Sequence, residues 1–556
     1  MIFAVIALGT ATPIANLSDE YLRELWKISP MTATQAGYHE GGADRQLDDL
    51  SAEGRRRRSE WLRQFAARLD QATPPESDPA AAEDRADAAL MRDAVALERL
   101  ELDEAHDFAR RCDAPLDALG NVFFQMVVRP SKKPPQERLA DVAARLDAVP
   151  RYLEQARAGL QFSVDVFREA AKDDGDGLID YLSHDLVGAF SGDKELAAPS
   201  ARAIAAVKSY LAFVDRELPK KPKASFRVGA ALYDKRFRPY LQTDRSPAEV
   251  LAAARARVEA LHAEMRRLAL VVDPKGGGDV RAALAKVAAD HPKPEALFET
   301  ARKDVEEARK FVVEKQLLTL EKRDNLRVIE TPQFMRSQLG VAAFDGAPPL
   351  EPEAGAFYYV TPFPPDWPPA KVDAKLREYN RWMLALITIH EAMPGHYVQF
   401  ERASSVEPPT RRVLRWLLSS NAYVEGWAVY TQDLMVDAGF WGGDPRLKLT
   451  EAKLELRAVV NAILDIQLQT TEFSDEQALA LLMDTAFQER PEAELKLRRA
   501  KLSVTQLCSY FVGGQTWREL RAEAERRPGF NQRAWHDRAL AEGAVTLPTL
   551  RKLLLH

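Results

Sequence analysis

The sequence has little cysteine, no excess of basic residues and no long apolar run. Of its 556 residues only Cys112 and Cys508 are cysteines, so a bound metal would have to be held by histidine and carboxylate. Lysine and arginine total 77 against 83 acidic residues, a formal net charge of −6, so the basic excess that nucleic-acid binding usually needs is absent. No apolar run approaches the ~20 residues that span a bilayer, so no integral membrane segment is expected.

Two common catalytic signatures are also missing. The dipeptide Gly-Lys occurs nowhere, which excludes a phosphate-binding loop, and there is no G-x-S-x-G nucleophile motif. Residues 103–106 spell DEAH, but without a phosphate loop they are expected to be a charged helical stretch. The four arginines Arg55–Arg58 are expected to form a solvated helix face. We therefore expect no nucleic-acid partner.

Most long segments have apolar residues three and four apart, the pattern of amphipathic helices. These segments include Val250–Leu270, Arg138–Val149, Pro294–Lys315 and Glu476–Glu489. Pro150 and Pro491 are expected to end two of them, because proline cannot continue a helix without losing a hydrogen bond. The clearest strand signal is Ala356–Thr361 (AFYYVT). The sequence therefore predicts a mainly α fold of many helices with one small sheet.

A linker at residues 218–225 divides the chain into an N-terminal helical region, residues 16–220, and a C-terminal catalytic region, residues 221–556. The two regions are expected to pack as one unit. Residues 1–15 (MIFAVIALGTATPIA) resemble the apolar core and cleavage site of a secretory signal, without its positive start. Either the chain starts inside a longer signal, or this is a loose apolar N-terminus. A periplasmic or secreted location is favoured over a cytoplasmic one.

The candidate chemistry begins in Trp382–Gln399 (WMLALITIHEAMPGHYVQ). The eight residues before His390 carry no charge, which predicts a buried helix, and a buried His390 and Glu391 need partners. His396 follows six residues later, roughly 120° off the helix face of His390 if the helix ran straight. Pro394-Gly395 predicts a kinked or bulged turn that swings His396 back to a shared ion. Glu391 would then be the general base toward a water at that ion.

A catalytic zinc site of this type needs a third protein ligand. The best candidate is Glu425, in the largely apolar helix predicted over Ser419–Leu434; the alternative for a buried glutamate is an ion pair with an arginine. Asn421 and Gln432 share its helix face and could support the ligands from a second shell. Gly426 would allow this helix to approach the His390 helix closely. His390, His396 and Glu425 would make a two-histidine, one-glutamate zinc set.

These stretches resemble a bacterial family, DUF885, that is placed with the gluzincin-type zinc metallopeptidases. The resemblance is carried by His390–Gln399 (HEAMPGHYVQ) and Glu425–Tyr430 (EGWAVY), with a weaker match at Ser509–Gly514 (SYFVGG). It implies a metallopeptidase-like fold with the small sheet beside the active-site helices. It also implies one zinc on His390, His396 and Glu425, with Glu391 as base.

Three tyrosines complete the candidate site. By analogy with gluzincins, Tyr510 could donate a hydrogen bond to the oxyanion of the tetrahedral intermediate; the alternative is a core tyrosine bonded to backbone. Tyr358 and Tyr359 lie on the predicted strand, whose exposed edge could pair with an extended peptide, or they serve packing alone.

The sequence thus predicts a zinc metallopeptidase that acts on a peptide or a small amide. Two alternatives remain open. One is a zinc amidohydrolase acting on non-peptide amides or modified amino acids, which would use the same tetrahedral chemistry. The other is a non-catalytic helical scaffold with a structural zinc, which would need a fourth protein ligand.

Overall fold

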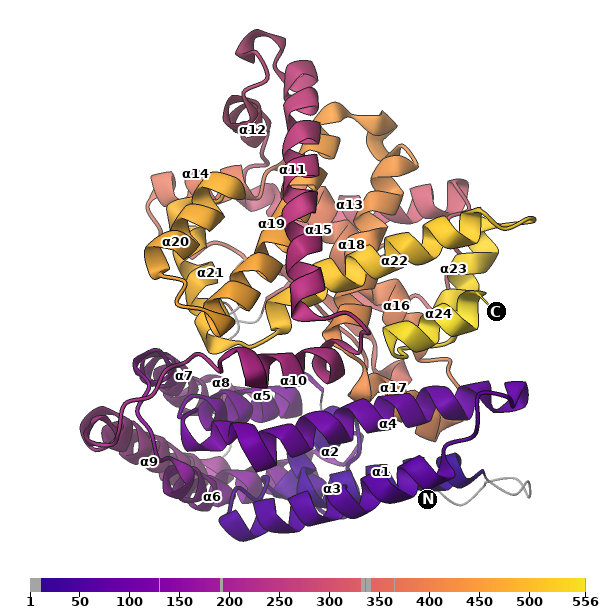
Figure 1. Cartoon of the computed structure of the whole chain (residues 1–556). Helices are drawn as coiled ribbons and strands as arrows, with labels where there is room; N and C mark the ends of the chain where they lie inside the picture. The colour runs from indigo at the N-terminus through magenta and orange to yellow at the C-terminus, as the bar shows by residue number, and fades with distance from the viewer. Residues whose placement is uncertain are drawn as a thin grey trace. The chain divides into compact units, whose positions relative to one another are not determined.

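The computed structural model describes residues 12–129, 131–190, 194–331, 336, 342–364 and 366–555, and the chain forms two compact units (Figure 1). One unit comprises the chain up to Ala224 together with Val406–Leu418, and the other comprises Ser225–Ser405 and Ser419–His556. Both are mainly helical and the second holds a small sheet, which confirms the predicted fold class. Of the predicted signal-like segment, residues 1–11 lie outside the described residues and Pro13 begins a helix.

The first unit is made of helices that pack on one another, with α6 and α7 both against α9. Its helices are α1 (Pro13–Ile28), α2 (Pro30–Gln35), α3 (Ala52–Ala72), α4 (Ala82–Leu100), α5 (Ala114–Val128), α6 (Pro135–Gly159), α7 (Asp165–Ser183), α8 (Asp185–Ala189), α9 (Lys194–Arg216) and α17 (Pro409–Leu418).

The second unit is built around α18, α19 and α22, and Figure 1 shows α11, in magenta, running beside α19. Its helices are α10 (Ala230–Leu241), α11 (Pro247–Val272), α12 (Val280–Ala288), α13 (Leu297–Glu314), α14 (Pro369–Glu378), α15 (Arg381–Glu391), α16 (His396–Ala403), α18 (Asn421–Asp437), α19 (Pro445–Thr470), α20 (Asp475–Ala480), α21 (Arg490–Leu502), α22 (Ser509–Glu525), α23 (Gln532–Ala541) and α24 (Leu547–Leu555). None of the described helices is both long and apolar enough to cross a membrane.

The helices expected from apolar spacing are present, but one predicted end is wrong. Pro150 lies inside α6 rather than at its end. Val149 and Leu153 beside it are buried, so packing of this helix outweighs the ~3 kcal/mol that an internal proline costs. Pro491 does mark a boundary, because it lies in the first turn of α21. The segment 476–489 is divided between α20 and a π-helical turn, Leu481–Thr485.

Three strands form the sheet: β1 (Leu326–Glu330), β2 (Ala342–Asp345) and β3 (Ala356–Val360), in the order β1-β3-β2. The predicted strand is confirmed as β3, which pairs in parallel with β1 and antiparallel with β2. The predicted exposed edge at Tyr358 and Tyr359 is therefore wrong, because β1 and β2 occupy both sides of β3. The sequence did not predict either neighbour, since both are short and neither has the clear alternation of a half-buried strand.

The closest helix packing in the second unit joins α18 to α22. A Cβ on Gly426 would lie 2.5 Å from the Cα of Gly513, and a Cβ on Gly513 would lie 1.9 Å from the carbonyl oxygen of Ala422. Glycine on both helices is what allows this approach. The expectation that Gly426 brings its helix close to the His390 helix was wrong: its partner is α22.

We expect Gly513→Ala to destabilise the second unit by on the order of 3 kcal/mol, because the added methyl group meets backbone that has no room to move. Gly177→Ala is the matched control, since this helical glycine of α7 has nothing within 4 Å of its Cβ position. That variant should be neutral or slightly stabilising. Thermal unfolding of both variants measures the difference, and equal melting temperatures would contradict the close-packing argument.

His536 of α23 is fully buried and contacts Tyr430 of α18. Its Nε2 lies 2.6 Å from the hydroxyl oxygen of Tyr430, and its Nδ1 lies 2.7 Å from the carbonyl oxygen of Leu317. Burial lowers the pKa of this imidazole to about 4. The folded chain therefore keeps His536 neutral at a pH where an unfolded histidine would be protonated.

This difference predicts a pH dependence of stability. As the pH falls from about 6.5 to about 4, the unfolded state gains a proton at residue 536 that the folded state does not, so the native state loses up to about 3 kcal/mol. In His536→Gln this contribution is absent, while all other titrating groups are shared. Denaturant unfolding across this range should show the wild type losing stability more steeply, and parallel curves would refute the assignment.

Candidate metal centre

Helix α15 delivers the first two candidate residues. The side chain of Asn380 accepts hydrogen bonds from the backbone amides of Trp382 and Met383, which fixes the start of the helix. Most of its residues between Trp382 and Ile389 are buried, as the uncharged run predicts. His390 and Glu391 form its last turn, so a buried helix carries an imidazole and a carboxylate to its C-terminal end.

The helix stops where Pro394 and Gly395 predict, and α16 begins at His396. The Gly395 amide donates to the carbonyl oxygen of Ile389 over 2.9 Å, which folds the chain back onto the last turn of α15. A Cβ on Gly395 would lie 1.9 Å from the carbonyl oxygen of His390, so this approach requires glycine. The ring centroids of His390 and His396 are 4.8 Å apart as a result.

Helix α18 is held against this turn by Trp427. Its indole Nε1–H donates to the carbonyl oxygens of Pro394, over 3.0 Å, and Gly395, over 3.3 Å. Sequence reasoning missed this contact, although the tryptophan stands two residues after Glu425 in the same motif. The bond ties the helix that carries Glu425 to the turn between the two histidines.

The three predicted ligands converge. The Nε2 atom of His390 lies 3.2 Å from Oε2 of Glu425, and the Nε2 atom of His396 lies 3.6 Å from the same oxygen. One ligand atom from each residue lies within 4.8 Å of the others. Ligand atoms of a tetrahedral zinc with bonds of about 2.0–2.1 Å lie about 3.4 Å apart, and the two distances to Glu425 match this separation.

The electrostatics of the cluster favour a cation. Although burial alone would raise it, hydrogen bonds from His390 and His396 hold the pKa of Glu425 well below its usual range. Burial opposes protonation of His396, but Glu425 outweighs it and raises the pKa of this imidazole. Among the described residues, no lysine or arginine lies within ion-pair distance of Glu425. The arginine partner that was the alternative for Glu425 is thus not found in the described chain.

Glu391, the last residue of α15, faces the same cavity as His390 and is hydrogen-bonded to the edge of the sheet. Its Oε2 accepts a hydrogen bond of 3.0 Å from the backbone amide of Phe344, on the edge strand β2. His390 and Glu391 both line a cavity of about 320 Å³, together with Gln432 and Tyr510. One carboxylate oxygen is therefore anchored while the group faces a space that can admit a substrate.

Of the two further predicted residues on α18, one lines the cavity and the other does not. Gln432 is buried in the cavity wall, where its Nε2 donates to the carbonyl oxygen of Leu386 over 3.0 Å, so it joins α18 to α15. Asn421 is exposed at the start of α18 and is hydrogen-bonded to the side chain of Tyr240. Asn421 is not among the described residues that line the cavity. Gln432 thus orients the helix of His390, and Asn421 does not reach the cluster.

Of the three predicted tyrosines, two pack within the fold and one lines the cavity. The Tyr358 hydroxyl lies 3.1 Å from Oγ1 of Thr388, and burial raises its pKa; it fastens the sheet to α15 two residues before His390. Tyr359 is buried and stacks on Phe357. Tyr510 lines the cavity, and burial raises its pKa to about 12, so it keeps its proton at neutral pH.

A second carboxylate group lies nearby but is already neutralised. Asp433, Glu451 and Glu455 could by distance hold a cation. The guanidinium of Arg518 pairs with Asp433 and, over 3.0 Å, with Glu455, which also binds Arg257. Burial and the neighbouring Asp433 raise the pKa of Glu451 well above its usual range. Arginine side chains thus neutralise these carboxylates, as a bound metal would do at the histidine cluster.

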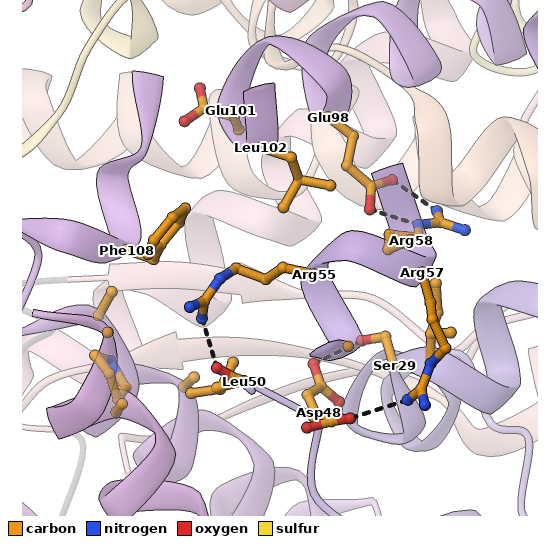
Figure 2. Close-up of a pocket in the computed structure, with 18 of the residues that line it drawn as sticks. Ser29, Asp48, Leu50, Arg55, Arg57, Arg58, Glu98, Glu101, Leu102 and Phe108 are labelled. Atoms are coloured by element: carbon orange, nitrogen blue, oxygen red, sulfur yellow. Dashed lines mark hydrogen bonds and ion pairs between the residues drawn. The ribbon is translucent and has the colours of Figure 1, made fainter. Parts of the chain in front are cut away.

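A larger cavity, of about 800 Å³, lies in the first unit (Figure 2). Arg55, Arg57 and Arg58 line it. The expectation that the arginine run is a solvated face holds for Arg57, which is exposed, but was wrong for Arg58, which is only 7% exposed. Figure 2 shows the pairing of Arg58 with Glu98, whose oxygens accept two bonds of 2.6 Å, and the bond from Arg55 to the carbonyl oxygen of Leu50. Arg55 and Arg58 are therefore bonded to other groups of the cavity wall.

Two solved structures resemble the whole chain. A protein described as "a putative lipoprotein of unknown function", from Shewanella oneidensis, is 26% identical and matches with a TM-score of 0.83, over 98% of this chain and all of that one. A second protein, described as "the putative lipoprotein from Colwellia psychrerythraea", is 16% identical with a TM-score of 0.79, over 98% of this chain and 99% of the other. No protein of curated function matches the chain.

A protein family matches nearly the whole chain, including the candidate site. Residues 30–554 match the family described as bacterial proteins of unknown function, DUF885. This span contains the three converging ligands, Glu391 and all of the cavity wall. The chain therefore belongs to the DUF885 family.

Proposed function

We propose that the chain is a zinc-dependent hydrolase that cleaves peptide bonds. The observation that carries the proposal is the convergence of His390, His396 and Glu425 beside a cavity that Glu391 also faces. Two neutral imidazoles and one carboxylate are the ligand set of thermolysin-like zinc enzymes, which keep one position open for water or substrate. The resemblance of both motifs to gluzincins supports the same assignment.

The chain's own residues supply the acid–base chemistry. Zinc held by the three ligands would polarise the scissile carbonyl and lower the pKa of a water to about 7. Glu391, held at one oxygen by the Phe344 amide, accepts the proton of the attacking water and passes it to the leaving amine nitrogen. Tyr510 keeps its phenolic proton and can donate a hydrogen bond to the oxyanion as it forms.

The three-residue ligand set argues against a structural zinc. Structural sites usually close with four protein ligands. Within the described residues the group contains three, and His390 faces a cavity. Hydrolysis of a non-peptide amide would use the same residues and remains the second candidate reaction.

The metal assignment predicts one zinc per chain, held through His396. His396→Ala should weaken zinc binding by more than ~100-fold, because loss of an outer-shell partner alone costs about 10–100-fold. His184→Ala is the control, since this side chain is 72% exposed and lies in the first unit. Elemental analysis and competition with a chelator measure both variants. Unchanged zinc affinity in His396→Ala would exclude this site.

Glu391→Gln should keep zinc and lose hydrolysis by about 10²–10⁴-fold, because the amide cannot accept the proton of the water. The control is Glu40→Gln, which alters the other His-Glu pair of the chain on an exposed side chain. Peptide pools analysed by mass spectrometry report cleavage, and a set of N-acyl amino acids tests the non-peptide alternative. Full activity of Glu391→Gln on either set would refute the role of this residue.

A further inference from the structure

The cavity beside the metal cluster contains a cation that has no function in the mechanism above. Lys496, on α21, lines the same cavity as His390 and Glu391. Among the described residues it makes no hydrogen bond and no ion pair, although Glu492, one turn earlier, contributes some attraction. Glu492 itself pairs with Lys375 over 3.0 Å. An ammonium group thus faces the reaction cavity without a close counterion.

The groups around Lys496 add positive charge rather than cancel it. Arg457, also in the cavity wall, and Lys453 share one carboxylate, that of Glu378, at 3.0 and 3.3 Å. Arg499, one turn after Lys496, donates to the hydroxyl of Tyr510 over 3.4 Å. Four cations therefore lie at or beside this end of the cavity with two carboxylates, those of Glu378 and Glu492, and Glu492 is itself paired with Lys375.

The acidic side chains of the cavity wall do not make up the difference. Glu455 is bound by Arg257 and Arg518. Burial and the neighbouring Asp433 raise the pKa of Glu451 well above its usual range, which favours the uncharged form of this group. Glu391 keeps its charge, but it acts on His396 at the metal cluster and is not among the charged groups that act on Lys496. The excess of positive charge at the Lys496 end therefore persists.

A part-buried ammonium without a counterion is costly, and burial together with Arg499 and Arg457 lowers the pKa of Lys496 to about 7. An anionic group on a ligand would recover this cost. At about 320 Å³ the cavity is at the low end of the ~300–1,000 Å³ of small-molecule pockets, so such a group would lie near the reacting bond.

We propose that Lys496 binds a carboxylate of the substrate, and that the enzyme therefore selects peptides with a free carboxylate within a residue or two of the bond that is cleaved. The inference rests on the proposed function, because it places the reacting bond at His390 and Glu391. The carboxylate is that of the chain end or of an acidic side chain, which share the same chemistry. Lys496 is a specificity-determining residue, and Arg457 adds to the field that attracts the anion.

The test measures binding rather than turnover. Zinc-loaded Glu391→Gln is dialysed to equilibrium against three sets of N-acetylated tetrapeptides: free acids, the same peptides as carboxamides, and carboxamides that end in glutamate. We expect the free acids, the glutamate carboxamides or both to bind about 10–100-fold more tightly than the plain carboxamides, the range of a hydrogen bond between charged groups. The better of the two carboxylate sets identifies the source.

Adding Lys496→Met to Glu391→Gln should abolish this preference and leave the binding of plain carboxamides and the zinc content unchanged. The matched control is Lys501→Met, on the same helix, whose ammonium pairs with Asp475 over 2.6 Å and is not in the cavity wall. Equal binding of acids and plain carboxamides, a preference that survives Lys496→Met, or no binding of any peptide would each overturn the inference.

These outcomes separate the inference from the proposed function. A wild-type chain that holds zinc and cleaves plain carboxamides as fast as free acids keeps the hydrolase assignment and overturns the role of Lys496. A chain that binds acids through Lys496 but hydrolyses neither peptides nor N-acyl amino acids supports the carboxylate site and refutes the hydrolase.

Discussion

The candidate site depends on the contact between Gly395 and the last turn of α15. With no Cβ at residue 395, the chain lies directly on the carbonyl oxygens of Ile389 and His390, and α16 can begin with its first imidazole beside that of His390. The indole of Trp427 binds the same turn and fixes the helix that carries Glu425. Three ligand atoms therefore meet because one turn of backbone is packed from both sides.

The two ends of the cavity differ in the sign of their unbalanced charge. The histidine cluster has a carboxylate and, in the described chain, no basic side chain beside it, so it suits a cation. The Lys496 end has the opposite imbalance, with cations that outnumber their carboxylates, so it suits an anion. The nearby group of Asp433 and Glu455 is neutral overall because Arg518 and Arg257 lie on it. A polar substrate that enters the cavity would be oriented between the two unbalanced ends.

The features that the sequence predicts correctly are those that depend on residue types and spacing within a short segment. The uncharged run before His390 predicts a buried helix, and Pro394-Gly395 predicts its interruption, because both effects act within a few residues. Sequence reasoning failed where long-range packing decided. Pro150 is accommodated inside a packed helix, and the edges of β3 are covered by strands that the sequence did not reveal. Gly426 faces Gly513, almost ninety residues later, rather than the helix expected.

Residue types and their spacing are enough to predict the mainly helical fold, the buried segments that carry His390 and Glu425, and histidine and carboxylate as the available ligands. Which of the surrounding groups reach the cavity depends on how distant segments pack. Lys496 lies in the charged stretch LKLRRAK, which has the composition of a solvated helix face, and nothing local distinguishes it from its neighbours. Whether a charge is exposed, paired or left facing a cavity depends on what distant segments pack against it, and that is a property of the folded chain.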